Sequence, residues 1–80
     1  MSTNYAFGPE TVEVLATAFH TSWSFISNDP YFATEDPVRL QRRLAECLLQ
    51  LAAEGEQGPL RLANGAIVRM RHEHSLRAAM

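Results

Sequence analysis

The stretch that most constrains the fold runs from Asp36 to Gly55, because it holds the strongest helical pattern of the chain and both of its ends are marked. Asp36 precedes a proline, which disfavours the α conformation at Asp36, and its carboxylate can accept the unpaired amides of a first helical turn. Pro37 suits the first helical position, where its missing N–H removes no hydrogen bond. Gly55 can adopt the left-handed conformation that closes a helix. These signals predict a helix between Asp36 and Gly55.

The apolar side chains of this helix cover an unusually wide arc. Five of them recur at helical spacing, and four more widen the stripe to roughly 200°. One neighbouring helix cannot cover an arc of this width, so we expect this helix to be packed from two sides. The stripe consists of Leu40, Leu44, Cys47, Leu48 and Leu51, and it is widened by Val38, Ala45, Leu49 and Ala52.

A second long helix is predicted from Pro9 to about Ser27, since a proline and an acid, Glu10, suit its first turn. One apolar stripe of this helix is about 100° wide, as expected for a helix that lies on a core. A smaller stripe points roughly 120° or more away from the first, so either the C-terminal segment or another chain must cover it. The first stripe comprises Val12, Leu15, Ala16, Phe19, Trp23 and Ile26, and the second comprises Val14, Ala18 and Phe25.

The linker between these helices contains a second helix-start signal. Asn28-Asp29-Pro30 ends the first helix, and the Asp-Pro pair within it predicts a short helical turn over residues 30–34. Tyr31 and Phe32 are adjacent aromatic residues, and we expect them to cover one end of the helix pair. A ligand-gripping loop is the alternative, but the sequence offers no convergent polar groups that would complete a pocket there.

The segment at residues 60–71 is compatible with two structures. Apolar residues at helical spacing favour a third helix from Pro59 to about Ser75. Asn64-Gly65 is a strong turn signal, and it gives a C-terminal β-hairpin at residues 60–71 as the alternative. Two strands alone are marginally stable in water, so we favour the helix, although an interior glycine costs it about 1 kcal/mol.

With 80 residues, of which 46% are hydrophobic and 20% charged, the chain is expected to form one small globular domain over residues 1–80. We expect its ordered part to span about residues 7–75, with residues 1–6 and 76–80 disordered. The fold class predicted from these elements is all-α: a small helical bundle of two long antiparallel helices with a third C-terminal helix.

Composition also indicates where the protein resides. No apolar run approaches the roughly 20 residues that span a bilayer, and residues 1–10 lack the basic start and apolar core of a secretory signal. A lone cysteine, Cys47, cannot form an internal disulfide. We therefore expect no membrane partner and a reduced, cytoplasmic location.

Two stretches, FGPETVEVLATAFHTSWSFI and LAECLLQLAAEGEQGPLRLA, cover about half of the chain and consist of helix caps and core positions. On these stretches the sequence resembles a group of short, uncharacterised helical proteins of rhizobia and related alphaproteobacteria, which has no assigned activity. The resemblance implies a cytoplasmic bacterial helical protein in which Gly58-Pro59 opens a third helix.

Residues with reactive side chains do not combine into a recognisable catalytic site. His72-Glu73-His74 resembles a metal site, but zinc takes three or four ligands, and we expect a solvated segment. His20 borders the first apolar stripe, and we expect it to be a half-buried packing residue. Cys47 lies among leucines, where a thiol is inert. Ser22 and Ser24 lack the glycine-framed turn that exposes a nucleophilic hydroxyl. We therefore predict no enzymatic activity, no metal and no cofactor, and we identify no small-molecule substrate; a metal-binding protein or an enzyme is the third alternative function.

Charge is distributed unevenly along the chain. Residues 1–59 carry three arginines and eight acidic residues, whereas residues 60–80 carry four arginines and one glutamate. Arg39, Arg42 and Arg43 form a possible basic patch on the central helix, which makes weak nucleic-acid binding one alternative function. The sequence pI of about 5.8 argues against it, since nucleic-acid domains typically exceed about 9. We expect a salt-bridged surface, with Arg39 paired to Glu35 or Asp36 and Arg42 to Glu46.

The surplus of apolar surface favours a protein that binds other proteins. Val14, Ala18 and Phe25 point away from the predicted core stripe, so they form the predicted interface. The leading hypothesis is a small regulatory or interaction protein that self-associates, most simply as a homodimer. The alternative within this hypothesis is a monomer in which residues 60–70 fold back and cover the surplus surface.

Overall fold

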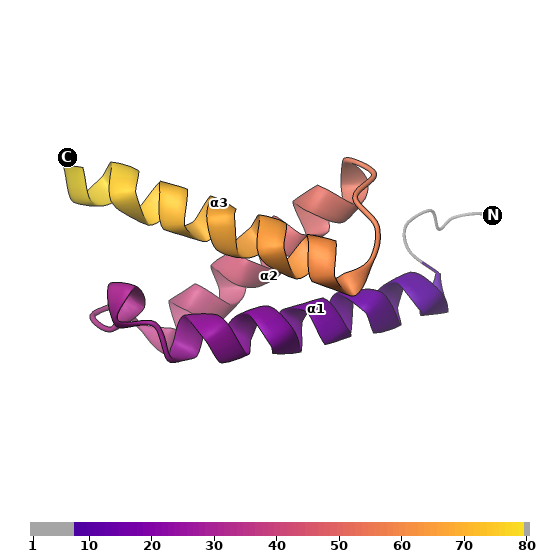
Figure 1. The fold of residues 1–80 in the computed structure, drawn as a ribbon, viewed down its shortest axis with the longest axis horizontal. Coiled ribbons are helices and arrows are strands. Elements are labelled where there is room, and N and C mark those ends of the chain that lie inside the picture. Colours follow the sequence, from indigo (N-terminus) through magenta and orange to yellow (C-terminus); the bar gives the residue numbers. More distant parts are fainter. Residues whose placement is uncertain (1–7, 80) are drawn as a thin grey trace.

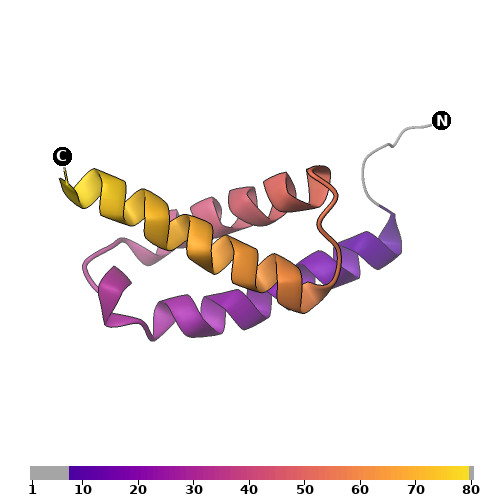
Figure 2. The same cartoon turned by 45° about the horizontal axis from the view of Figure 1, so that its top comes forward.

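The structure, a computed structural model, describes residues 8–79, of which 77–79 are described by their backbone alone. It contains three α-helices, α1 (Pro9–Ser27), α2 (Pro37–Ala53) and α3 (Pro59–Ala79), and one 3-10 turn, η2 (Pro30–Phe32). The chain reverses direction at each connection, so α2 runs antiparallel to both α1 and α3 (Figure 1). The second view shows α3 lying across the other two helices (Figure 2). The predicted all-α bundle is confirmed.

The ends of the helices follow from the residues that the sequence places there. The Asp36 carboxylate accepts the Val38 amide at 3.0 Å, and the Asp29 carboxylate accepts the Tyr31 amide at 3.0 Å. Each aspartate thus caps the element that the following proline begins. Gly55 has a φ of +101°, which is the left-handed conformation predicted to end α2.

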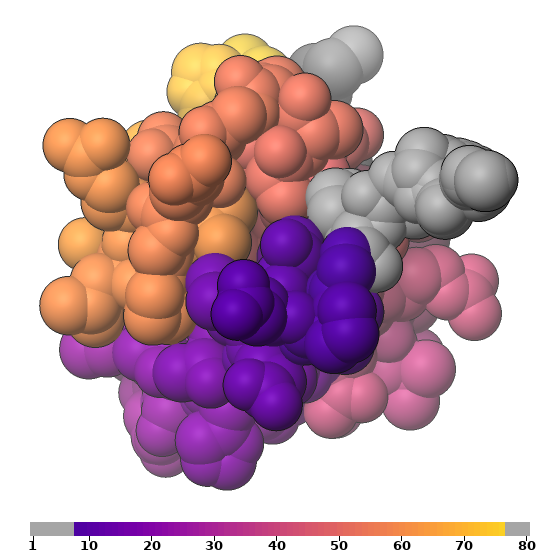
Figure 3. Space-filling model, turned by 90° about the vertical axis from the view of Figure 1, so that its right-hand side faces the viewer, coloured from indigo at the N-terminus to yellow at the C-terminus, as the bar shows by residue number. Residues whose placement is uncertain are grey.

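The core lies where the three helices meet, and α2 contributes the largest share of it. α2 packs against both α1 and α3, which confirms the prediction of two neighbours. Seen from the end at which α1 begins, the indigo start of α1 lies between orange atoms of α3 and pink atoms of α2 (Figure 3). The outermost members of the predicted arc, Val38 and Leu49, remain exposed, because two neighbours cover only its middle. The buried residues of α2 are Leu40, Leu44, Cys47, Leu48 and Leu51.

The segment after Pro59 is a helix, so the β-hairpin alternative is wrong. Gly65 occupies the side of α3 that faces α2, and a Cβ atom there would lie 3.0 Å from Leu51 Cδ1. The glycine therefore marks a close approach of two helices, and the Asn64-Gly65 pair forms no turn. α3 also continues to Ala79, past the predicted end at Ser75. The prediction of disorder is wrong for residues 76–79, because leucine, arginine and alanine continue a helix readily. Residues 1–6 and 80 lie outside the described part.

The face that α1 buries is rotated from the predicted one. Ala18, Ser22 and Ile26 are its fully buried residues, whereas Val12 and Ala16 of the predicted core stripe are exposed. α1 packs more extensively against α3 than against α2, so the face that it buries differs from the single seam that the sequence predicted. The same rotation exposes His20, so the prediction of a half-buried packing histidine is wrong. The buried residues of α3 are Leu62, Ala63, Ala66 and Met70.

Candidate functional site

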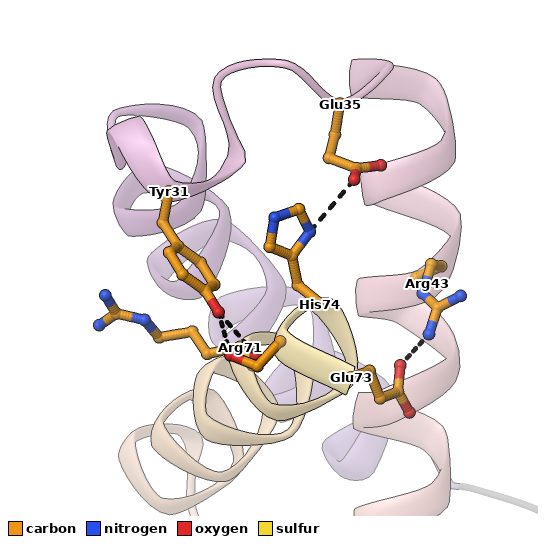
Figure 4. A network of polar contacts seen from close by, with 7 residues as sticks. Tyr31, Glu35, Arg43, Arg71, Glu73 and His74 are labelled. Carbon is orange, nitrogen blue, oxygen red and sulfur yellow. Dashed lines mark hydrogen bonds and ion pairs between the residues drawn. The ribbon is translucent and has the colours of Figure 1, made fainter. Parts of the chain in front are cut away.

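The largest concentration of polar contacts lies where the 28–36 linker meets the C-terminal half of α3 (Figure 4). We call it the corner cluster, and it comprises Tyr31, Phe32, Glu35, Arg71 and His74. His74 Nδ1 lies 3.1 Å from Glu35 Oε2, and its ring packs edge-on against Tyr31 and Phe32 at centroid distances of 4.7 and 5.4 Å. The cluster therefore holds the linker against α3 through aromatic packing and the contact of His74 with Glu35.

Tyr31 makes the most contacts in the corner cluster. Its hydroxyl lies 3.4 Å from the carbonyl oxygen of Arg71 and is hydrogen-bonded to Ser75. The Arg71 guanidinium lies 5.1 Å from the centre of the Tyr31 ring, which is a cation–π distance, and 3.7 Å from Asp29 Oδ2. Phe32 is buried in the core beside it. The two aromatics thus cover one end of the bundle, as the sequence predicts.

The side chains of the corner cluster are suited to a structural role, which is to hold the 28–36 linker against α3. A histidine–carboxylate pair is also found in catalytic sites, but there it adjoins a nucleophile and a pocket. Two grooves lie on the described part of the bundle, one near the start of α1 and one between the end of α1 and α3. Neither His74 nor Glu35 lines them. Among residues 8–76, no three histidine, cysteine or acidic side chains lie close enough together to hold a metal ion. His72 is exposed, whereas His74 faces the linker, because residues two apart diverge on a helix.

The predicted basic patch is divided by the fold. The Arg43 guanidinium donates to the Glu73 carboxylate of α3, whereas Arg39 and Arg42 are exposed on α2. Within residues 8–76, the predicted pairs of Arg39 and Arg42 with nearby acids do not form. Contacts that join different elements of the fold form instead, and sequence spacing could not reveal them. They are the ion pairs Arg43–Glu73, Arg69–Glu54 and Arg71–Asp29, and the contact of His74 with Glu35.

The Arg69–Glu54 pair joins the middle of α3 to the residue that follows α2. Arg69 Nη2 lies 2.9 Å from Glu54 Oε1, and this hydrogen bond lowers the pKa of Glu54. Because the folded-state pKa lies below the unfolded value, the pair stabilises the fold above the unfolded pKa of Glu54. Its contribution is lost as the pH falls through the folded-state value.

Cys47 is buried on α2, as predicted, and this burial raises the pKa of its thiol. Glu73 raises this pKa further, while Arg43 opposes the shift. The thiol is thus kept in its neutral, weakly nucleophilic form. The pKa of the Cys47 thiol is higher in the folded state than in the unfolded state. The thiol therefore leaves the free energy of unfolding unchanged below its unfolded-state pKa, and it lowers that free energy as the pH rises through its folded-state pKa.

We expect Cys47 to react at least about tenfold more slowly with a thiol reagent in the native protein than in the unfolded chain at pH 8, because reaction requires the core to open. The absorbance change of a disulfide-exchange reagent, followed with and without denaturant, measures the two rates. Equal rates would show that the thiol is accessible in the folded state.

Ser22 is a buried polar residue whose position the sequence did not reveal. It is fully buried, and its hydroxyl donates to the carbonyl oxygen of Ala18 at 2.6 Å. This bond within the helix satisfies the hydroxyl, so the residue behaves as a small core side chain and not as a nucleophile. Its spacing of four from Ala18 and from Ile26 was the only available sign of the buried face.

A shallow groove runs along the seam of α1 and α3, next to the corner cluster. Phe25 is 65% exposed on the α1 side of the groove, and Ile67 on the α3 side packs partly against the core. We call the surface of α1 and α3 on both sides of this seam the α1–α3 face. The groove is lined by Ser24, Phe25, Asn28, Asp29, Pro30, Ile67 and Arg71.

The three residues of the predicted interface have different environments. Phe25 is exposed on the α1–α3 face, Val14 is half-buried against the core, and Ala18 is 0% exposed. Ala18 therefore cannot contact a second chain, and its assignment to the interface is wrong. α3 covers it, as the monomer alternative required for this residue. Phe25 is not covered.

No protein-family model matches the chain, and neither a curated protein nor a solved structure matches it. The resemblance to the rhizobial group therefore stays a prediction. None of the helices in the described part of the chain has the length and apolar character that crossing a bilayer requires.

Proposed function

We propose that this chain is a small protein-interaction protein of the bacterial cytoplasm that self-associates as a homodimer through the α1–α3 face. The observation that carries the proposal is the exposure of Phe25 beside Ile67, at the groove between α1 and α3. An exposed aromatic ring beside aliphatic side chains is typical of interfaces, where aromatic residues are enriched. A small bundle also gains stability when a partner extends its core.

The exposed side chains support nucleic-acid binding less well than they support self-association. Arg43 is bound to Glu73, so two exposed arginines of the predicted patch remain on α2. Two phosphate contacts would supply weak, strongly salt-dependent binding. The corner cluster supports a structural role, because its polar groups contact one another and line no deep pocket.

The test is the substitution Phe25→Glu. A carboxylate at the centre of an apolar contact is expected to raise the dimer dissociation constant by about 30-fold or more, the range of an interface hot spot. Sedimentation equilibrium measures this constant, and circular dichroism checks that the protomer stays helical. The fold should survive, because Phe25 is 65% exposed within the protomer.

Val38→Glu is the matched control, because Val38 is 63% exposed on α2. This variant should keep the wild-type dissociation constant. If Phe25→Glu associates as tightly as the wild type, the α1–α3 face is not the interface.

A further inference from the structure

The side of α1 on the α1–α3 face carries a regular row of residues. Their spacing alternates between four and three, so they lie along one side of the helix, as in the seam of two packed helices. Two of them, Ser24 and Asn28, line the groove beside Phe25, which places the row on the α1–α3 face. The row consists of Glu10, Val14, Thr17, Thr21, Ser24 and Asn28.

α3 carries a parallel row at the same alternation of spacing. Ile67 and Arg71 line the groove opposite Phe25, so the row borders the same seam. Leu60 is 68% exposed at the start of this row. Because α1 and α3 run in the same direction, the first residues of both rows lie at the same end of the bundle (Figure 2). The row on α3 consists of Leu60, Asn64, Ile67 and Arg71.

The two ends of this face carry opposite charge beside apolar residues. At the end where the rows begin, Glu10 is exposed next to Val14 on α1, and Leu60 is exposed at the start of α3. Arg61 at this end is paired with Glu56 at 3.6 Å, so the Glu10 carboxylate gives the end its negative charge. At the other end, Arg71 adjoins Phe25 and Ile67. The small residues Thr17 and Thr21 lie between the two ends.

The Arg71 guanidinium can bind a further carboxylate. Its distance of 3.7 Å from Asp29 Oδ2 is longer than a hydrogen bond, and its side chain is 53% exposed. A guanidinium has five N–H donors, whereas the contact over the Tyr31 ring uses its face. The donors at its edge therefore point to an acidic partner beyond the protomer.

A face with an acid at one end and an arginine at the other is complementary to itself. A twofold axis perpendicular to α1, passing between Thr17 and Thr21, exchanges the two ends. We propose that a second copy of this chain binds the α1–α3 face with its α1 antiparallel to the first. Arg71 of each copy then pairs with Glu10 of the other, and Phe25 packs on the Val14 and Leu60 end of the other. This arrangement rests on the proposed self-association and specifies its geometry.

The dimensions of α1 are compatible with this arrangement. Glu10 and Asn28 are 18 residues apart, which is roughly 27 Å along a helix, and they are equidistant from residue 19. Threonines at the axis allow the two helices to approach closely, since the interaxial distance depends on the side chains at the contact. In a dimer with a twofold axis each contact between the copies occurs twice, so each contact contributes twice to the free energy of association.

The test exchanges the two charges. Glu10→Arg alone or Arg71→Glu alone places two like-charged contacts in the dimer, and each is expected to raise the dissociation constant about tenfold or more. An equimolar mixture of the two single variants forms a heterodimer in which both contacts are attractive. This mixture and the double variant should return to within about threefold of the wild type. Sedimentation equilibrium at low salt measures all five samples.

Glu46→Arg is the control, because it makes the same charge change on the exposed face of α2. It should associate as the wild type does. If a reversed charge unfolds the protomer, Glu10→Gln and Arg71→Gln are measured instead, and each should weaken association about threefold.

The outcomes separate this inference from the proposed function. If the wild type dimerises but the single variants associate as it does, the antiparallel pairing is wrong and self-association stands. If both single variants weaken the dimer and the mixture does not recover, the pairing is also wrong. A wild type that stays monomeric at every concentration overturns the proposed function itself.

Discussion

Leu44→Ala is expected to lower the free energy of unfolding by about 3 kcal/mol. Leu44 is 0% exposed at the middle of α2, between α1 and α3. Removing three carbon atoms from such a site loses their transfer free energy and leaves a cavity that the helices fill only in part. A domain of 80 residues has modest stability, so this loss is a large part of the total.

Leu49→Ala is the matched control, since Leu49 lies on the same helix with 46% of its surface exposed. We expect it to cost less than about 1 kcal/mol. Urea unfolding followed by circular dichroism, at a protein concentration where the chain is monomeric, measures both values without any contribution of association. Equal losses for the two variants would contradict the placement of Leu44 at the centre of the core.

Ala66→Leu is expected to destabilise the fold by about 3 kcal/mol, in this case through overpacking. Ala66 is 0% exposed on α3, and it belongs to the same core as Ala18 of α1, which is also 0% exposed. A leucine adds three carbon atoms at a fully buried position, so the surrounding side chains and helices would have to shift.

The control for Ala66→Leu is Ala16→Leu, which makes the same change at an exposed position of α1. Leucine and alanine have similar helix propensities, so we expect a change within about 0.5 kcal/mol. Thermal unfolding by calorimetry compares the two variants. A tolerated leucine at position 66 would mean that the core around Ala66 is not closely packed.

The sequence predicted those features that depend on neighbouring residues. Asp36 and Pro37 mark the start of α2 through their own side chains and φ preferences, and Gly55 marks its end through its left-handed φ. Asp29 marks η2 in the same way. The buried stripe of α2 was also predictable, since its leucines alone satisfy the helical period.

Features that depend on the partner helix could not be predicted. The buried face of α1 is set by its packing against both α2 and α3, so Ala18 and Ser22 are buried while Val12 is exposed. Gly65 suits a turn by local preference, but in the fold it admits the Leu51 side chain of α2. The ion pair of Arg43 with Glu73 joins positions 30 residues apart. Helical spacing does not indicate such a pair.

The most direct test of the account is the solution mass of the wild-type protein, measured by sedimentation equilibrium over a wide range of concentrations. One chain weighs 9.0 kDa. We predict that the mass rises with concentration towards twice this value and stops there. A twofold interface is used up when two copies have bound, so no third copy can add to it. A mass that stays at that of one chain at every concentration would contradict it, since Phe25 would then be exposed without a second copy to cover it.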